Sequence, residues 1–227
     1  MDGNGRWATR NGLPRAVGHE RGVEALRRTV KAAQALGLSY LTVYSFSTEN
    51  WRRPVAEVSA LFALLKTFIH RDLDRLVREG VRIRVLGTRS GLPEDIDALL
   101  DRAESETRAN SRFNLGIAFN YGGREEIVRA AQEIARKVLT GEIAPDGIDE
   151  AMIAKNLDTA DFPDPDLIIR TGEEQRISNF LIWQAAYAEL MFMDVLWPEF
   201  GQAQLEEALA TFAARERRFG GLKSGAS

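Results

Sequence analysis

Arginine, serine, asparagine and glycine recur in segments that directly follow short apolar runs of the sequence. The segments are STENWRRP at 47–54, NYGGR at 120–124, RTG at 170–172 and RISN at 176–179. Arginine binds phosphate oxygens through two N–H groups at once, and glycine lets backbone N–H groups approach an anion at a helix start. One polar loop of this kind carries little weight. Arg53, Arg170 and Arg176 at the same end of one sheet predict a polyanionic ligand.

The first residues add a group with related chemistry. Residues 2–7 read DGNGRW, and Arg15 and His19 follow. Asp, Asn and Gly favour turns, so the run alone predicts only a turn. A turn with a carboxylate, two glycines and an arginine can also hold a diphosphate and its Mg²⁺, which takes one or two carboxylates plus phosphate oxygens. The full GxGxxG dinucleotide fingerprint and the GxxxxGK[ST] phosphate loop are both missing from the sequence.

Composition excludes several other kinds of site. The 227 residues include no cysteine and two histidines. This excludes disulfides, cysteine-ligated zinc, iron–sulfur clusters, a cysteine nucleophile and a histidine-rich metal site. The formal net charge is −3. Since general nucleic-acid binders usually show a clear basic excess, no nucleic-acid partner is expected.

The elements that must position these residues alternate along the chain. At roughly 150 residues per domain, the length predicts a single domain over residues 1–227. The β-rich runs predict strands at 41–46, 81–86, 115–119, 167–169 and 190–193, and the remaining patterns predict helices at 21–36, 57–79, 93–109, 124–139, 148–157, 179–187 and 202–217. This alternation predicts an α/β fold with a mostly parallel central sheet flanked by helices. Ligands of such sheets bind beyond the carboxyl ends of the strands.

No targeting or membrane-spanning segment is predicted. The first fifteen residues lack the apolar stretch of a signal peptide. The most apolar long window, residues 181–197, is interrupted by Gln184, Glu189 and Asp194, whereas a spanning helix needs about 20 mostly apolar residues. The expectation is a cytoplasmic protein without a transmembrane segment that can still contact a membrane surface.

The predicted helix at 57–79 has one apolar stripe with a spacing of three and four. Its members are Val58, Leu61, Phe62, Leu65, Phe68, Ile69, Leu73 and Leu76. Most stripes of this kind pack on a sheet. Periodicity leaves a second interpretation open, in which part of the stripe lines a tunnel for an apolar ligand.

Several long motifs in order resemble the cis-prenyltransferases, also called isoprenyl transferases or undecaprenyl diphosphate synthases. They are MDGNGRWA at 1–8, GHERG at 18–22, YSFSTENWRRP at 44–54, FNYGGR at 119–124, DPDLIIRTG at 164–172, RISNFLIWQAAYAEL at 176–190, WPEF at 197–200 and RERRFGG at 215–221. The resemblance covers nearly the whole chain. It implies an Mg²⁺-dependent enzyme that condenses isopentenyl diphosphate with an allylic diphosphate, usually farnesyl diphosphate. The implied product is a Z-polyprenyl diphosphate such as undecaprenyl diphosphate.

The resemblance also implies a role for each matching residue. Asp2 would be the central catalytic carboxylate and bind Mg²⁺, and Glu189 would be a second carboxylate of the metal site. The allylic diphosphate would be held by Gly3, Asn4, Gly5, Arg6, Arg15 and His19, and the isopentenyl diphosphate by Arg170, Arg176 and Ser178. Further positions around the substrates are Trp7, Ser47, Thr48, Glu49, Trp51, Arg53 and Ile177.

The side-chain chemistry of His19 and of Asn50 limits the role that each can have. His19 beside a diphosphate should be protonated, because nearby negative charge raises a histidine pKa. It would then donate a hydrogen bond rather than act as a base. Asn50 is expected at the catalytic centre as an orienting hydrogen-bonder, since an amide has no useful basicity. A carboxylate or the released diphosphate would accept the proton that isopentenyl diphosphate loses.

The resemblance extends to product length and assembly. The stripe at 57–79 and the apolar face of the strand at 113–119 would form the wall of a product tunnel, with Phe113 at its floor. The family generally forms homodimers, and the segment Arg218-Phe219-Gly220 matches a C-terminal motif that can reach a neighbouring active site. An equally weighted interpretation of this segment is a solvated basic terminus. Contact with a membrane surface would serve product release.

Two features depart from the family pattern. Family members usually have an apolar strand before DGNGR, whereas Met1 stands immediately before Asp2 here. A sheet without this strand would expose unpaired edges, so the chain as it stands is expected to be destabilised and weakly active. We interpret the difference as a start codon assigned too late. The second departure is Glu173, where a small residue is common. Its carboxylate would compete for Arg170 and Arg176, or point to solvent.

Two other functions are weighed against this one. The first is an N-terminally truncated, non-catalytic prenyl-diphosphate-binding or partner subunit. Intact Asp2, Asn50, Arg170, Arg176 and Glu189 argue against it. The second is a trans-prenyltransferase, an all-helical enzyme that uses DDxxD pairs. Residues 161–166 read DFPDPD, which has the wrong spacing and contains prolines.

Overall fold

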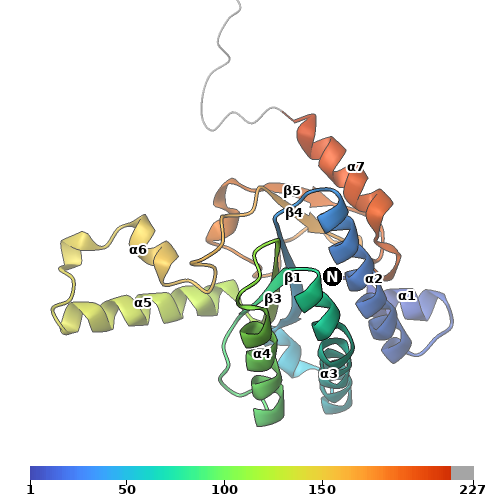
Figure 1. Cartoon of the computed structure of the whole chain (residues 1–227), viewed down its shortest axis with the longest axis horizontal. Coiled ribbons are helices and arrows are strands. Elements are labelled where there is room, and N and C mark those ends of the chain that lie inside the picture. The colour runs from blue at the N-terminus through green and yellow to red at the C-terminus, as the bar shows by residue number, and fades with distance from the viewer. Residues whose placement is uncertain (216–227) are drawn as a thin grey trace, which may run out of the picture.

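Helices and short parallel strands alternate through residues 1–215, the part of the chain that the computed structural model describes (Figure 1). The strands are β1 (Tyr40–Ser47), β2 (Val81–Leu86), β3 (Phe113–Tyr121), β4 (Leu167–Arg170) and β5 (Glu189–Phe192). The helices are α1 (Asn4–Arg10), α2 (Arg15–Ala35), α3 (Val55–Arg78), α4 (Glu94–Thr107), α5 (Gly123–Leu139), α6 (Glu150–Lys155) and α7 (Gln202–Ala213). Short 3₁₀ turns are η1 (Thr48–Arg52), η2 (Pro145–Gly147), η3 (Gln184–Tyr187) and η4 (Trp197–Glu199).

Every strand pair in this part of the chain is parallel. β3 lies between β1 and β2, and β4 pairs with β5 in a second sheet. β3 is buried along almost its whole length because it has a strand on each side, which explains its continuous apolar run. The structure therefore confirms the predicted α/β fold with a mostly parallel sheet flanked by helices.

A cavity separates the two sheets. It measures about 820 Å³, and both β1 and β4 line it. Within residues 1–215, β1 pairs with β3 alone and β4 with β5 alone, so each has one edge without a strand partner. Asp2 lies at this division, where its backbone N–H donates to Thr171 Oγ1 at 3.1 Å and its carbonyl accepts from Trp197 N at 3.0 Å.

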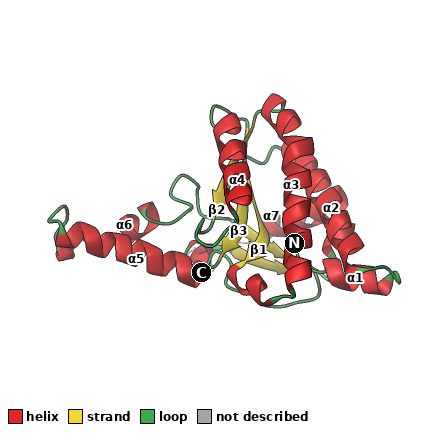
Figure 2. Ribbon diagram, turned by 90° about the horizontal axis from the view of Figure 1, so that it is seen from below, coloured by secondary structure: helices red, strands yellow, loops and turns green. Residues whose placement is uncertain are grey.

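The main core forms between β1–β3 and the helices α2, α3 and α4, which stand together beside the sheet (Figure 2). The predicted stripe on α3 is buried from Val58 to Leu76, except for Leu61, which is partly buried. α3 begins directly after Pro54, which cannot donate a backbone hydrogen bond, and ends before Gly80, which has φ 74°. The apolar period of α3 is what holds the site-bearing turn η1 against the body of the molecule.

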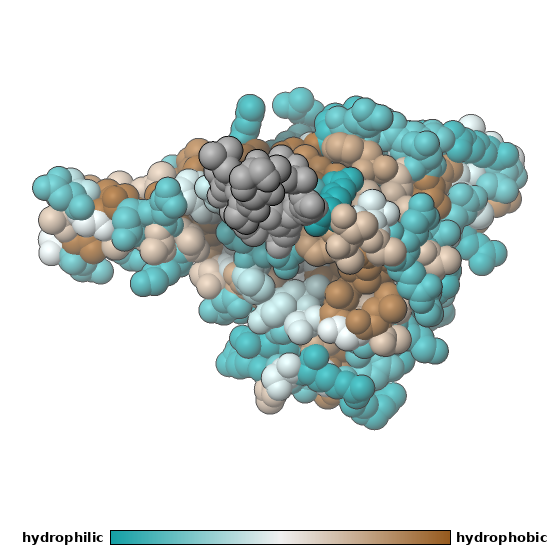
Figure 3. Space-filling view, turned by 90° about the horizontal axis from the view of Figure 1, so that it is seen from above, coloured by the Kyte–Doolittle hydropathy of each residue, from teal (hydrophilic) through white to brown (hydrophobic). Residues whose placement is uncertain are grey.

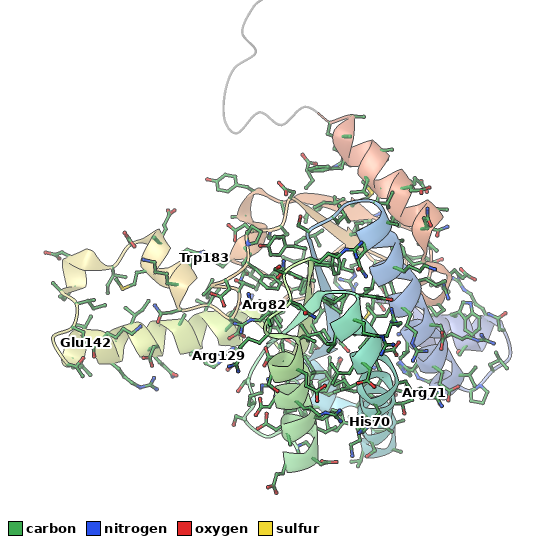
Figure 4. All side chains as sticks on the ribbon, in the orientation of Figure 1. His70, Arg71, Arg82, Arg129, Glu142 and Trp183 are labelled. Atoms are coloured by element: carbon green, nitrogen blue, oxygen red, sulfur yellow. The ribbon has the colours of Figure 1, made fainter. Side chains whose placement is uncertain are left out.

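α5 and α6 form an arm that extends from the body (Figures 1 and 2). Arg129 anchors the base of the arm through two hydrogen bonds to Asp158, at 3.0 and 2.7 Å, and Glu142 lies at its far tip (Figure 4). Leu139, near that tip, is 87% exposed. Figure 3 shows apolar residues gathered over the body and hydrophilic residues around its rim. None of the helices described has the length and apolar character needed to cross a bilayer.

The prediction of a helix at 179–187 was wrong. Ser178, Asn179 and Leu181 have φ values of 49°, 64° and 45°, in the left-handed region that a helix cannot contain. Only η3 (Gln184–Tyr187) forms in this stretch. Asn179 stabilises the irregular backbone, because its side-chain oxygen accepts from Arg124 N at 2.9 Å and its amide donates to Glu49 Oε1 at 2.9 Å.

Candidate functional site

A second cavity of about 240 Å³ joins the polar N-terminal turn to the apolar interior. Its polar end is lined by Asp2, Gly3, Asn4, Gly5, Arg6, Arg15, His19, Asn50 and Arg53. Its apolar end is lined by Val23, Leu26, Leu61, Leu64, Leu65, Phe68, Ile117 and Phe119. The arrangement is suited to a ligand with a charged head and a hydrocarbon chain.

The carboxylate of Asp2 lies among cationic and N–H groups at the polar end. Arg170 Nη2 donates to Oδ2 at 3.0 Å, Gly3 N donates to Oδ1 at 2.7 Å, and Arg6 Nη2 lies 3.3 Å from Oδ1. Burial alone would raise the pKa of Asp2, but the hydrogen bond and charge of Arg170 outweigh burial and lower it. Asp2 is therefore ionised at neutral pH.

Arg170 connects Asp2 to the segment that follows β4. Besides its bond to Asp2, it donates to Ser178 Oγ at 2.7 Å and to the carbonyl of Arg176. The left-handed backbone of Ser178 turns this segment back toward Arg170. The fold thus brings together Arg170, Arg176 and Ser178, which the sequence assigns to one substrate.

The N-terminal turn is held by a close crossing of α1 and α2. A Cβ atom at Gly18 would lie 2.1 Å from the carbonyl oxygen of Asn4, and one at Gly22 would lie 2.5 Å from Asn4 Oδ1. The glycines of the GHERG motif are therefore required for α2 to contact residue 4. His19, between them, is carried to the cavity wall by the same crossing.

Glu57 is a site residue that the sequence reasoning missed. Its Oε1 lies 3.2 Å from Arg15 Nη2, 3.0 Å from Arg53 Nη1 and 3.5 Å from His19 Nε2. Burial raises the pKa of Glu57, but the hydrogen bond and charge of Arg15 and the charge of Arg53 outweigh it and lower that pKa. Arg53 precedes α3 and Glu57 lies in its first turn, four residues later. This spacing is typical of an ion pair and could have indicated Glu57.

The surroundings of His19 favour its neutral form. It is 9% exposed, and its Nε2 has no hydrogen-bond partner. Burial lowers the pKa of His19, and the neighbouring Glu57 carboxylate only partly offsets that effect. The expected protonated form would need the additional negative charge of a bound diphosphate.

The turn η1 carries Asn50, which lines both cavities, and its neighbour Trp51. Asn50 Oδ1 accepts from Ser47 N at 3.1 Å and so closes the turn on itself. Ser47 and Asn50 both line the larger cavity, as do Ile177 and Ser178. A Cβ at Gly122 would lie 2.7 Å from Thr48 Oγ1, which shows how closely η1 approaches the start of α5.

The carboxylate of Glu173 points away from Arg170. Its two oxygens accept from Arg10 Nη2 at 2.9 and 2.8 Å, and its backbone has φ 64°. The neighbouring Glu174 pairs with Arg176, and its Oε1 lies 3.6 Å from Arg6 Nη1. Glu173 Oε2 also lies 3.9 Å from Arg6 Nη1, so both carboxylates contact an arginine of the expected diphosphate sites, and Glu174 contacts two.

The chain does not bring Glu189 to Asp2. Glu189 begins β5 opposite Leu167, whereas Phe192 lies opposite Arg170, so the two carboxylates face opposite ends of the β4–β5 pair. Three residues along a strand span about 10 Å. Glu189 pairs instead with Arg215. Among residues 1–215, no group of three or more His, Asp or Glu side chains is arranged to hold a metal. The two carboxylates that the resemblance assigns to one metal site lie at opposite ends of the β4–β5 pair within one chain, and their shared role stays a prediction.

Other predicted positions lie away from the cavities or beyond the structure. In the described part of the chain, Thr48, Glu49 and Trp51 of η1 line neither cavity. Trp7, on α1, does not line either cavity in the described part of the chain. Phe113 is fully buried in the core opposite Val81 and is missing from the described wall of the smaller cavity. Its predicted place at a tunnel floor was wrong, because it faces the core rather than the cavity. The segment Arg218-Phe219-Gly220 lies outside the described residues.

Comparisons with known proteins point to one family. A family model described as "Putative undecaprenyl diphosphate synthase" matches residues 1–220. Isoprenyl transferase 2 of Bradyrhizobium diazoefficiens is 60% identical over 222 residues, which cover 98% of this chain and 88% of that protein. Isoprenyl transferase of Agrobacterium fabrum is 56% identical and covers 98% and 90%.

Two solved structures have the same fold. Lavandulyl diphosphate synthase from Lavandula x intermedia, in complex with dimethylallyl diphosphate, has a TM-score of 0.94 and 38% identity and covers 97% of this chain and 95% of that one. A probable undecaprenyl diphosphate synthase from Campylobacter jejuni has a TM-score of 0.78 and 31% identity and covers 88% and 92%.

Proposed function

This chain belongs to the cis-prenyltransferases, the family of isoprenyl transferases and undecaprenyl diphosphate synthases, and on that premise we propose that it extends an allylic diphosphate with isopentenyl diphosphate. The proposed primer is farnesyl diphosphate, and the proposed product is a long Z-polyprenyl diphosphate. One observation carries the proposal: an ionised Asp2, bound to Arg170, lies at the mouth of an apolar cavity.

The allylic substrate would bind with its diphosphate at the N-terminal turn. Arg6 and Arg15 supply charge there, and Gly3, Asn4 and Gly5 leave backbone groups close to the ligand. Its hydrocarbon chain would enter the apolar end of the cavity. Isopentenyl diphosphate would bind at Arg170, Arg176 and Ser178, displacing the carboxylate of Glu174 from Arg176. Asp2 is shared by both regions.

The donor set fits Mg²⁺ that is held mainly by substrate oxygens. Among residues 1–215, Asp2 is the one carboxylate that lines the polar end of the cavity, and its side chain is 42% exposed. Mg²⁺ commonly takes one or two carboxylates, phosphate oxygens and waters. Bound there, Mg²⁺ would neutralise charge on the leaving diphosphate. Arg6 and Arg15 would assist, because preorganised cations are most effective where charge develops.

The reaction breaks the C1–O bond of the allylic diphosphate and joins C1 to C4 of isopentenyl diphosphate, whose C2 then loses a proton. Asp2 is a weak base because its pKa is lowered, and the Asn50 amide has no useful basicity. We therefore assign the proton to the released diphosphate. Asn50 in η1 and Arg53 directly after it would orient the two substrates.

Product length is proposed to depend on Phe68. It is the lining residue of α3 farthest from Glu57, about 16 Å along the helix at 1.5 Å per residue. We expect Phe68→Leu to shift the product distribution by at least one five-carbon unit, because it opens the closed end of the cavity. Phe113→Leu is the matched control, since it makes the same change in the core outside the cavity wall. Reversed-phase chromatography of labelled products reads both; an unchanged distribution in Phe68→Leu would contradict the assignment.

Binding of the allylic diphosphate is expected to take up a proton at His19. The free-state pKa of His19 lies below its usual 6.5 through burial, and the bound diphosphate would raise it. The affinity for farnesyl diphosphate should therefore fall as pH rises from the free-state pKa to the bound-state pKa, by at most about tenfold per pH unit. Calorimetric titration over pH 5–9 measures this. In His19→Asn, the affinity should change with pH only through titration of the ligand. Equal slopes of affinity against pH in the two proteins would contradict the prediction.

The proposal includes a homodimer that works in the cytoplasm. The arm supports the dimer, because Val128 and Leu139 are 54% and 87% exposed on α5 and large exposed apolar groups favour contact surfaces. Sedimentation of the whole chain should give twice the mass of 25.3 kDa. A monomer at micromolar concentration would contradict this part of the proposal.

The reaction itself is tested with farnesyl diphosphate, labelled isopentenyl diphosphate and Mg²⁺. We expect label in an extractable polyprenyl product, and loss of that product when EDTA removes the metal. The competing function, a non-catalytic subunit, predicts saturable binding of farnesyl diphosphate without turnover.

A further inference from the structure

Asn120, at the carboxyl end of β3, has an environment that the proposed function does not yet use. It belongs to the FNYGGR motif, is 2% exposed, and has φ 50°. A left-handed backbone is uncommon outside glycine, although asparagine tolerates it better than most residues. The side chain is therefore presented from a buried and strongly specified position.

Both ends of the Asn120 amide are engaged. Its Nδ2 donates to the carbonyls of Thr88 at 2.8 Å and Ser90 at 3.1 Å, and its Oδ1 accepts from Trp51 Nε1 at 2.8 Å. Two carbonyls can only accept, so they fix which end of the amide faces them. The oxygen must then face the indole N–H. The loop at 87–90 thus determines that the amide oxygen of Asn120, and not its nitrogen, faces the indole N–H of Trp51.

Trp51 connects the Asn120 side chain to η1. Its indole packs edge-on against Phe46 and Phe62, with ring centroids 5.5 Å apart in each case. None of the residues of η1 (Thr48–Arg52) is buried, so side-chain bonds act together with the packing of the Trp51 indole to hold the turn. The other side-chain bond from η1 to a distant segment links Glu49 to Asn179.

We propose that Asn120 is a positioning residue, which fixes η1 through the indole of Trp51 so that Asn50 and Arg53 face the substrates. The inference rests on the proposed function and extends it to a residue that lines neither described cavity. Without the amide, Trp51 and the turn would sample other positions, and fewer molecules would have Asn50 in place.

Asn120→Gly and Trp51→Phe, singly and together, test the proposal. Glycine keeps the left-handed backbone and removes the amide, and phenylalanine keeps a ring and removes the N–H. Each single change should lower kcat/KM for isopentenyl diphosphate about tenfold, the effect of one lost buried hydrogen bond. Because both remove the same bond, the double variant should be no worse than about tenfold. Effects that multiply toward a hundredfold, or an Asn120→Gly variant equal to wild type, would overturn the proposal.

Asn110 offers a matched control. Its side-chain amide also donates to two carbonyls, of Val77 at 3.2 Å and Val81 at 2.8 Å, but at the amino end of β2, away from the site. Asn110→Ala should lower the unfolding temperature without changing kcat/KM by more than about twofold. If it lowers kcat/KM as much as Asn120→Gly does, the Asn120 effect is structural.

A readout without turnover separates this inference from the proposed function. The ¹⁵N–¹H resonance of the Trp51 indole, assigned by its loss in Trp51→Phe, reports the bond to Asn120 directly. It should move in Asn120→Gly and stay in Asn110→Ala. If wild type makes no product, the proposed function fails; if the resonance does not move in Asn120→Gly, the inference fails, whatever the activity.

Discussion

Asp2→Asn is expected to lower kcat about 10²- to 10³-fold, the effect of removing a preorganised charge from a reacting centre. The asparagine oxygen can still accept from Gly3 N, 2.7 Å from the native Oδ1, but the amide nitrogen replaces Oδ2 and loses the 3.0 Å bond from Arg170. The backbone bonds of residue 2 to Thr171 and Trp197 should preserve the local fold. What disappears is the negative charge that would bind Mg²⁺ beside the diphosphate. Steady-state kinetics at saturating substrates measures the loss.

Asp95→Asn is the control for this change. Asp95 is an exposed carboxylate on α4 that pairs with Lys66. Neither residue lines a cavity described above. Its replacement removes the same charge and should leave kcat within about twofold, since exposed ion pairs contribute little. If Asp2→Asn kept more than about a tenth of wild-type kcat, Asp2 would not be the central carboxylate.

Arg170→Ala is expected to lower kcat/KM for isopentenyl diphosphate about 10²-fold or more. Arg170 is 15% exposed and bonds Asp2, Ser178 and the Arg176 carbonyl at once, and a fork of several N–H groups binds a diphosphate more firmly than a single cation. Arg170→Lys keeps the charge without the fork and should lie between alanine and wild type. Initial rates over both substrate concentrations separate the two KM values.

Arg102→Ala provides the comparison, because Arg102 forms only an exposed ion pair with Glu106 on α4. It should leave both KM values unchanged. The assignment of Arg170 to isopentenyl diphosphate would be contradicted if Arg170→Ala changed the KM for farnesyl diphosphate alone.

The sequence predicts the parts of this molecule that depend on local pattern. The period-two and buried apolar runs locate the strands, and the parallel arrangement places Arg53, Arg170 and Arg176 at the carboxyl ends of β1 and β4. The α3 stripe can be recognised from its spacing. The structure shows that it packs in the core and that part of it lines a cavity, and the role of this cavity as a tunnel for an apolar ligand stays a prediction. Phe62 and Leu65 are buried in the core, and Leu65 also lines the cavity.

The parts that could not be predicted depend on contacts between distant residues. The role of Glu57 depends on α2 bringing Arg15 and His19 to α3, which no local pattern indicates. The prediction of a helix at 179–187 failed because Asn179 bonds Glu49 and Arg124 and prefers that tertiary environment to a helix. Glu189 matched a motif, but strand register directs it away from Asp2.

The central claim is that this chain joins isopentenyl diphosphate to an allylic diphosphate with Z geometry. The most direct measurement is an incubation of the whole chain with farnesyl diphosphate, radiolabelled isopentenyl diphosphate and Mg²⁺. The product is then compared by reversed-phase chromatography with polyprenyl standards of known length and double-bond geometry. We expect a labelled product that elutes with a long Z-polyprenyl standard and that Asp2→Asn does not make. Saturable binding of both substrates without product, or a product with E geometry at the new double bonds, would contradict it.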